Sequence, residues 1–139
     1  MKKRYVLEYE PKLDFSVLAI NSHAKAYKLC WNINKTLNVC FEKLKDQMVN
    51  TKTNFSRYFG VTEEGVEYNI LSNRSKTGYL IPDQKSINYF LITKNRNWRV
   101  EKKQIINKLR KNKEVLLVFE FDAQKNKYTD RFFLNDTEN

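Results

Sequence analysis

Few side chains in this sequence combine the type and spacing that catalysis or metal binding requires. His23 is the only histidine, and the only cysteines are Cys30 and Cys40. A Ser-His-Asp or Cys-His arrangement would need His23, which follows a predicted helix start and is expected to have a local or solvent-facing role. The cysteines form no Cys-x-x-Cys pair, and the sequence contains no Gly-rich phosphate loop. We therefore predict a protein that is not an enzyme, with no catalytic residues, metal, cofactor or small-molecule substrate.

Positive charge is concentrated in one segment of the chain. Residues 94–113 hold nine Lys or Arg and a single acid, Glu101, which gives this segment +8 of the total net charge of +10. The nine basic residues are Lys94, Arg96, Arg99, Lys102, Lys103, Lys108, Arg110, Lys111 and Lys113. The charge asymmetry of the molecule therefore belongs mainly to this segment, which also has the spacing of a helix.

The basic residues of this segment are not spread evenly around the predicted helix. At helical spacing, Arg99, Lys103 and Arg110 form a stripe beside the apolar face, and Lys102 and Lys113 flank that stripe. Clustered Lys and Arg side chains on one surface are typical of proteins that bind the phosphate backbone of nucleic acids. We therefore predict a contact with RNA, or with a ribonucleoprotein, through these five side chains.

Two alternatives to RNA binding stay open. A charged helix face is most often simply solvated, and a coding bias toward Lys, Asn and Ile would produce the same charge. The chain could also be a protein–protein adaptor or regulatory subunit that uses a sheet edge, the predicted hairpin of residues 55–71 or the segment 80–89. Exposed aromatic side chains would favour RNA, since bases stack on them, and Tyr58 and Tyr68 are candidates if they face outward.

Residues 80–89 contain a recognisable pattern, Ile81-Pro82-Asp83, three further residues, and Ile87-Asn88-Tyr89. The pattern resembles the signature of a bacterial family named after it, the IPExxxVDY proteins. Three of the six fixed positions are kept, and the other three hold chemically similar residues. Further similarity is found at Ser22-His23, Tyr27-Lys28-Leu29-Cys30-Trp31, Asn34-Lys35 and Phe119-Glu120. The family has no established activity, so the resemblance implies relatives without implying a function.

The signature can be interpreted as a structural element or as a catalytic one. Pro82 fixes its own backbone angle and favours an extended residue before it, and Asp83 is a common turn residue. Ile87 and Tyr89 would then share one face of the next strand with Leu91. The catalytic interpretation would pair Asp83 with position 88, but Asn88 carries an amide, which cannot act as a general base. We therefore predict a structural role for the signature.

The remaining pattern predicts an α+β fold in a single domain, residues 1–134, with a frayed tail at 135–139. Two main helices are expected, at about residues 23–37, with an N-cap at Asn21 or Ser22, and at about 98–111. A mostly antiparallel sheet of about five to seven strands should complete the domain. The expected strands are residues 5–9, 39–43, 55–61, 66–71, 87–93 and 114–122, with a short edge strand at 128–134. Residues 15–20 are apolar but could be either type, and the run 115–119, apolar on both faces, suits a central strand.

Length, composition and the N-terminal sequence bound the class of protein. A chain of 139 residues fits one domain with a real core, and its 14% aromatic content is typical of folded proteins. Glu8 and Glu10 interrupt the N-terminal segment before any apolar run develops, which argues against a signal peptide. The longest apolar run, 115–119, is too short to cross a bilayer. We expect a cytoplasmic protein with reduced thiols and no membrane contact.

Overall fold

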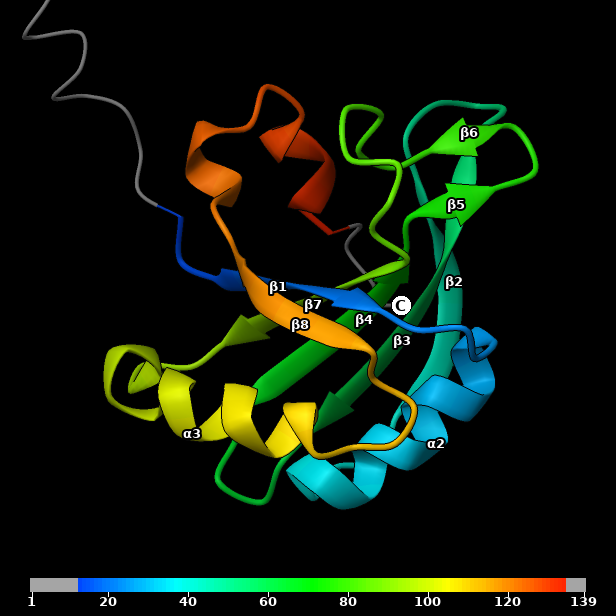
Figure 1. Ribbon diagram of the computed structural model, residues 1–139. Helices are drawn as coiled ribbons and strands as arrows, with labels where there is room; N and C mark the ends of the chain where they lie inside the picture. The colour runs from blue at the N-terminus through cyan, green and yellow to red at the C-terminus, as the bar shows by residue number, and fades with distance from the viewer. Residues whose placement is uncertain (1–12, 135–139) are drawn as a thin grey trace, which may run out of the picture.

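The computed structural model describes residues 13–134, which form a six-stranded antiparallel sheet with two helices on one face (Figure 1). Along the chain the elements are β1 (Ser16–Asn21), α2 (Ala26–Leu37), β2 (Glu42–Met48), β3 (Asn54–Val61), β4 (Glu67–Ser72), β5 (Arg74–Ser75), β6 (Gly78–Tyr79), β7 (Tyr89–Lys94), α3 (Trp98–Arg110), β8 (Leu117–Phe121), and the 3-10 turns η1 (Ala123–Lys125) and η2 (Thr129–Phe132). The strand order is β2-β3-β4-β7-β1-β8, and β5 pairs with β6 separately. The predicted α+β fold, with two helices and a mostly antiparallel sheet, is confirmed. The expected strand at 5–9 and the tail at 135–139 lie outside the described residues.

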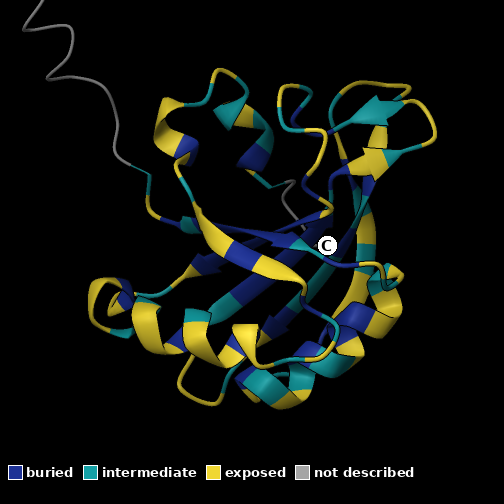
Figure 2. Ribbon diagram, in the orientation of Figure 1, coloured by how far each residue is buried: buried dark blue, intermediate teal, exposed yellow. Residues whose placement is uncertain are grey.

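Strands β1 and β7 lie inside the sheet because most of their side chains are apolar. The segment 15–20, whose type the sequence left open, is mostly the strand β1, and Leu18 of β1 is opposite Leu91 of β7. Because successive side chains of a strand point to opposite faces, Leu18 faces the helices while Val17 and Ala19 face away from them. Figure 2 shows the buried centre of the sheet in dark blue.

The helices pack on one face of the sheet through apolar residues at helical spacing. Trp98, Ile105 and Leu109 of α3 are buried, as their spacing predicts. Helix α2 begins at Ala26, later than expected, because Ser22 does not cap it: the Ser22 hydroxyl accepts from the Ala24 amide in the preceding turn. Figure 2 shows exposed residues (yellow) along the outer sides of both helices. Neither helix in the described part of the chain is long and apolar enough to span a membrane.

The second face of the sheet is covered by loops and not by helices. Figure 1 shows the connection before β7 and the two 3-10 turns on the side opposite α2 and α3. The predicted edge strand at 128–134 is wrong, since this segment forms η2 and places Phe132 against Phe90 and Phe121, with ring centroids 5.1 and 5.9 Å away. Local hydrogen bonds bend the chain here: the Asn126 side chain accepts from the Tyr128 amide.

Two further strand predictions are corrected by the sheet topology. The segment 114–122 was expected at the centre of the sheet, but β8 is an edge strand that pairs with β1 alone among the described residues. Leu117 and Phe119, on the face of β8 opposite the helices, are 52% and 37% exposed, while Val118 is buried under the helices. The strand expected at 39–43 begins only at Glu42. The hairpin between β3 and β4 is as predicted, with Gly65 at φ 92° in the turn.

Candidate nucleic-acid interface

The predicted basic stripe lies on an exposed flank of α3. Buried Trp98, Ile105 and Leu109 fix the rotation of this helix on the sheet, so that Arg99, Lys103 and Arg110 follow the flank next to its buried face. All three are exposed, and none has an ion pair with another described residue. Their charges therefore face solvent without a compensating carboxylate.

Lys102 and Lys113, which were predicted to flank the stripe, have different surroundings. The Lys102 ammonium is 3.1 Å from a carboxylate oxygen of Glu120, and the other Glu120 oxygen accepts from the Trp98 indole at 3.3 Å. Lys102 therefore helps to join α3 to β8, and Glu120 offsets part of its charge. Lys113 lies beyond the end of α3 and is exposed. Of the five predicted side chains, four remain available to an anionic partner.

Exposed aromatic side chains occur on α2, where the sequence reasoning did not place them. Tyr27 and Trp31 are 66% and 59% exposed, and the Lys35 ammonium lies 4.0 Å from the centroid of the Trp31 ring. The spacing of four residues puts these three side chains in one row along the outer face of α2. That spacing was the available signal in the sequence for an exposed aromatic row.

The tyrosines suggested for base stacking do not face outward. Tyr68 is buried in the core under the helices, and burial raises the pKa of its phenol above the ordinary value. Tyr58 is half-buried and packs against the same core. A stacking surface on this protein would therefore use Trp31 and Tyr27 instead.

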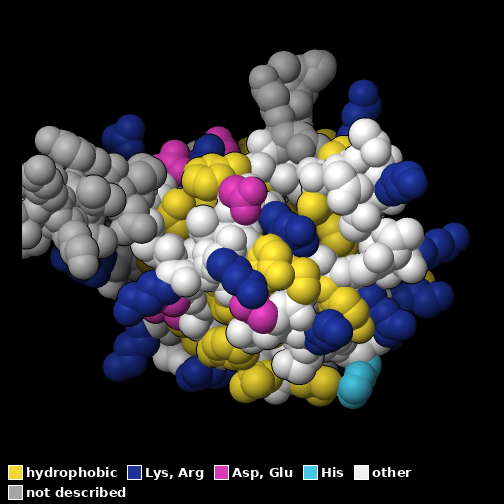
Figure 3. All heavy atoms as spheres, turned by 90° about the horizontal axis from the view of Figure 1, so that it is seen from above, with side chains coloured by type: hydrophobic (Ala, Val, Ile, Leu, Met, Phe, Trp, Pro, Cys, Tyr) yellow, Lys and Arg dark blue, Asp and Glu magenta, His cyan; other side chains and the backbone are white. Residues whose placement is uncertain are grey.

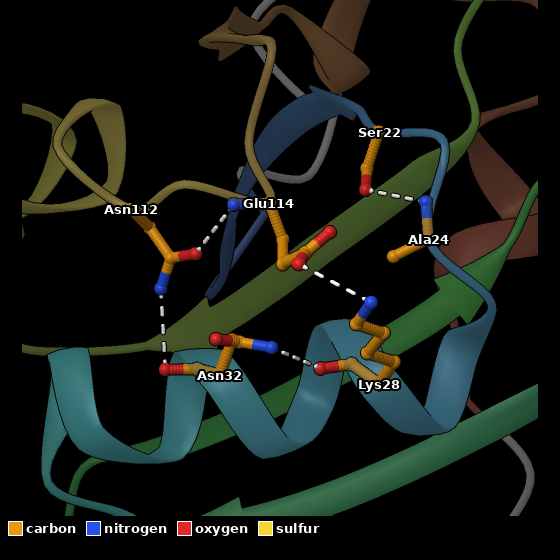
Figure 4. A network of polar contacts seen from close by, with 6 residues as sticks. All are labelled: Ser22, Ala24, Lys28, Asn32, Asn112 and Glu114. Carbon is orange, nitrogen blue, oxygen red and sulfur yellow. Dashed lines mark hydrogen bonds and ion pairs between the residues drawn. The ribbon is translucent and has the colours of Figure 1, made fainter.

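A polar junction fixes the two helices as one layer (Figure 4). The Asn112 amide, directly after α3, donates to the Asn32 carbonyl at 3.2 Å and to the Thr36 hydroxyl at 2.8 Å. Its oxygen accepts from the Glu114 amide, and the Glu114 carboxylate lies 3.6 Å from the Lys28 ammonium. The C-terminal end of α3 is thereby held beside the Asn32 and Thr36 side of α2. We call the exposed side chains of both helices the helical-layer surface.

Carboxylates contribute little negative charge to the helical-layer surface. Helix α2 contains no acid, and the one acid of α3, Glu101, accepts a hydrogen bond from Asn95 at 2.9 Å. Glu114 and Glu120, at the rim of the layer, lie beside Lys28 and Lys102. The unpaired charges on this surface are therefore almost all positive. Such a surface attracts phosphate groups and repels other cations.

The signature segment is held in place by one buried side chain. Asn73, which is 0% exposed, donates through its amide to the carbonyls of Gln84 and Ile87 at 2.9 and 2.8 Å. Its side-chain oxygen accepts from the Ile81 amide at 2.9 Å. The side chain thus bonds to three points of a loop that pairs with no strand in the described part of the chain, and these bonds hold the loop on the sheet. Nothing in the sequence pattern singled out Asn73.

The other signature residues contact separate parts of the molecule. The Asn88 side chain accepts from the Ser22 amide, while Asp83 accepts from Asn126 near the C-terminal turns, so the structure does not join them in one site. Tyr89 donates to the Ala24 carbonyl at 2.6 Å and packs under the helices with Leu91. Ile87, expected on the same face as Tyr89, lies in the opposite core because β7 begins only at Tyr89. Pro82 is half-buried beside buried Ile81.

The residues considered for nucleophilic or metal chemistry lie apart or are buried. Cys30 is 3% exposed, and burial raises the pKa of its thiol to about 12, which keeps it protonated at neutral pH. Cys40 and His23 are exposed. Within residues 13–134, no three His, Cys, Asp or Glu side chains gather in a group that could hold a metal ion.

Comparison with known proteins adds no assignment to these observations. No protein-family model matches the chain, and no curated protein matches it. The resemblance to the IPExxxVDY family stays a prediction that rests on the residues of the signature.

Proposed function

We propose that this chain is a small cytoplasmic, non-enzymatic protein that binds RNA, or an RNA-containing assembly, through the helical-layer surface. The observation that carries the proposal is the presence, on one layer, of unpaired basic side chains and exposed aromatic rings. Arg99, Lys103 and Arg110 supply charge without ion-pair partners, and Trp31 presents an exposed ring with Lys35 over it. Proteins that bind single-stranded nucleic acid combine these two features, because charge holds the backbone while rings stack on bases.

The length of the basic stripe suits an extended strand. With a rise of about 1.5 Å per residue, Arg99 and Arg110 lie about 16 Å apart along the axis of α3, with Lys103 between them. The Asn112 junction joins the C-terminal end of that stripe to α2. A strand that follows α3 to this end would reach α2, the helix that carries Tyr27 and Trp31.

Salt dependence of RNA binding tests the proposal most directly. For single-stranded RNA, log affinity should fall with log salt, with a slope of about −0.7 per phosphate contacted. Replacing Arg99, Lys103 and Arg110 together by Glu should abolish most binding and reduce the slope by about 2. The matched control is Lys45, Lys52 and Lys127 replaced by Glu, which changes net charge equally at exposed positions outside both helices. If both triple variants lost the same RNA affinity, binding would follow from net charge, and the proposed role of the helical-layer surface would be wrong.

The contribution of stacking can be separated from that of charge. Trp31→Ala should weaken binding by about 1–3 kcal/mol while leaving the salt slope unchanged, because a stacked ring binds no counterion. Folding should be little affected, since Trp31 is 59% exposed. Fluorescence anisotropy of a labelled oligonucleotide measures both quantities. A Trp31→Ala variant that binds as tightly as the original protein would remove the aromatic row from the proposal.

A protein–protein adaptor is the second candidate, and one observation favours it. Strand β8 ends the sheet with exposed apolar side chains, Leu117 and Phe119, and its outer edge has no strand partner among residues 13–134. Exposed edges of this kind accept an added strand from another protein. Pull-downs with the tagged chain, with and without nuclease, distinguish the candidates. Adaptor binding should survive nuclease and be lost in Phe119→Lys, whereas assemblies held by RNA should be lost on nuclease treatment.

A further inference from the structure

A cleft of about 410 Å³ lies between the connection from β1 to α2 and the segment that carries the signature. Basic or polar side chains from three separate segments line it: Ser22, His23 and Lys25 from the connection, Arg74 from β5, and Lys85 and Asn88 from the signature segment. Among residues 13–134, no carboxylate lines the cleft. In the view from above (Figure 3), the histidine side chain lies at the margin of the molecule beside dark blue Lys and Arg side chains. The cleft belongs to neither the helical-layer surface nor the β8 edge.

Both walls of the cleft are held by hydrogen bonds. The Ser22 amide donates to the Asn88 side chain at 2.9 Å and the Tyr89 hydroxyl donates to the Ala24 carbonyl at 2.6 Å, which fixes the connection to α2. Across the cleft, Arg74 pairs with Tyr79 in the small β5–β6 hairpin. The Lys85 ammonium lies 5.6 Å from the Tyr79 ring centroid, which restrains it on that wall. The backbone segments that carry the cations are therefore held by hydrogen bonds on both sides of the cleft.

The charge of the cleft is uncompensated. Lys25, Arg74 and Lys85 all line the cleft, and none of them has an ion pair with any described residue. Like charges that line one cleft repel one another, and an anion bound among them offsets that repulsion. The N-terminus of α2 adds to this field, because Lys25 is its N-cap, no side chain caps it and its first turn holds no acid. A dianion with several acceptor oxygens would satisfy these groups best.

We propose that this cleft binds a phosphomonoester, carried either by a small phosphorylated molecule or by the 5′ end of an RNA. Arg74 would donate a bidentate pair of hydrogen bonds to the phosphate, and Lys25 and Lys85 would supply point charges. Asn88 contributes through its neutrality: its oxygen is occupied by the Ser22 amide, and it adds no negative charge to the cleft. This inference does not rest on RNA binding by the helices, because different residues carry it.

Asn88→Asp is the sharpest test, because it changes charge without removing the hydrogen bond. An aspartate retains an oxygen for the Ser22 amide, so the fold should persist, but it places a carboxylate beside the phosphate site. Titration of the full chain with inorganic phosphate and with adenosine 5′-monophosphate, followed by amide NMR, should give saturable shifts at Ser22, His23 and Asn88. Asn88→Asp should weaken both affinities about tenfold or more, since a unit charge near a phosphate is strongly repelled.

Two controls keep the test decisive. Asn107→Asp adds the same charge at an exposed position on α3 and should leave the phosphate affinity within about twofold. Arg74→Gln with Lys85→Gln should weaken binding about tenfold, whereas Lys45→Gln with Lys127→Gln should not. The absence of saturable shifts with either phosphate probe would overturn the proposal. So would equal affinities of the Asn88→Asp and Asn107→Asp variants.

The two sources of the phosphate are distinguished by RNA probes. If the ligand is an RNA end, an oligonucleotide with a 5′-phosphate should bind more tightly than the same oligonucleotide with a 5′-hydroxyl, and Asn88→Asp should remove the difference. If the ligand is a small molecule, the two oligonucleotides should bind equally while adenosine 5′-monophosphate still binds the cleft. The Glu reversal of Arg99, Lys103 and Arg110 should leave phosphate binding unchanged. Loss of RNA binding by the helices and loss of phosphate binding by the cleft are therefore measured separately.

Discussion

The Asn73 side chain holds the signature loop to the sheet, so its removal tests how that loop is stabilised. Asn73→Ala would leave the buried Ile87 carbonyl and the Ile81 amide without a partner, and the Gln84 carbonyl with only the Ile87 amide. We expect a loss of about 2–4 kcal/mol in the free energy of unfolding, since each unsatisfied buried group costs about 1–3 kcal/mol. Urea denaturation measures this change in the free energy of unfolding. Asn88→Ala, which removes a single acceptor, should cost less, and an equal cost would contradict the central role of Asn73.

The two cysteines should differ sharply in reactivity. Exposed Cys40 should react with a thiol reagent within seconds to minutes at pH 8, whereas Cys30 should react only when the protein unfolds. Cys30 is protected twice, because it is 3% exposed and because burial raises the pKa of its thiol to about 12. Counting labelled thiols by mass spectrometry, with Cys40→Ser as the control, checks this. Rapid labelling of Cys30 in that variant would show that α2 opens locally.

The same raised pKa values predict a loss of stability in alkali. The Cys30 thiol and the Tyr89 phenol, with ordinary pKa values of 9.0 and 10.0, are both raised to about 12 by burial. Above pH 9 the unfolded chain therefore binds fewer protons than the folded one, and stability falls as pH rises toward 12. Below pH 9 this contribution is fully present. Unfolding at a series of pH values measures the decline, which should be smaller in the Cys30→Ala variant.

At the scale of elements, the sequence predicts the helices better than it predicts the role of each strand. Apolar spacing places Trp98, Ile105 and Leu109 on the buried face of α3 because a helix repeats over several turns. The run at 115–119 is apolar on both faces, a pattern that central and exposed edge strands can share. Only the partners of a strand decide between them, and those partners are distant in sequence. The same limit applies to Trp31, whose exposure depends on how α2 is rotated on the sheet.

The junction of α2 and α3 can be tested as a unit. Asn112→Ala removes the donors to Asn32 and Thr36 and the acceptor for the Glu114 amide. We expect a loss of about 1–3 kcal/mol in the free energy of unfolding, because several hydrogen bonds with a half-buried side chain are lost. Asn107→Ala on the exposed side of α3 is the matched control and should change stability little. If RNA crosses this junction, Asn112→Ala should also weaken RNA binding without changing net charge.

Considered as a whole, the molecule differs strongly between the two faces of its sheet. One face is covered by two helices with a basic outer surface, and the other by loops and 3-10 turns held by Asn73 and an aromatic cluster (Figure 1). Sequence periodicity predicts the helices that cover the first face, because the apolar residues of a helix recur every three or four positions. It does not predict the cover of the second face, because the hydrogen bonds of Asn73 and the packing of Phe132 join segments that are far apart in the chain. The proposed phosphate cleft was missed for the same reason, since its cations come from three such segments.

The packing of the C-terminal turns on the second face of the sheet should depend on Phe132 far more than on Phe133. Phe132 is 1% exposed and packs edge-on against Phe90 and Phe121. Phe132→Ala should lower the free energy of unfolding by about 3–5 kcal/mol, because the cavity cannot be filled by a rigid sheet beneath it. Phe133→Ala is the matched control, since Phe133 is 52% exposed and its carbonyl, which accepts from Gln47, is retained. That variant should lose about 1 kcal/mol or less.

The outcome of this pair also decides whether the C-terminal turns fold with the sheet or close over it independently. If they are a separate cover, Phe132→Ala should increase binding of a hydrophobic dye such as ANS while the urea midpoint of the sheet, followed by far-ultraviolet circular dichroism, stays near that of the original protein. If they fold with the sheet, the dye should bind only within the shifted unfolding transition. We expect the second result, because Phe132 joins the same buried cluster as Phe90 of the central strand β7, and loss of that contact weakens the whole core.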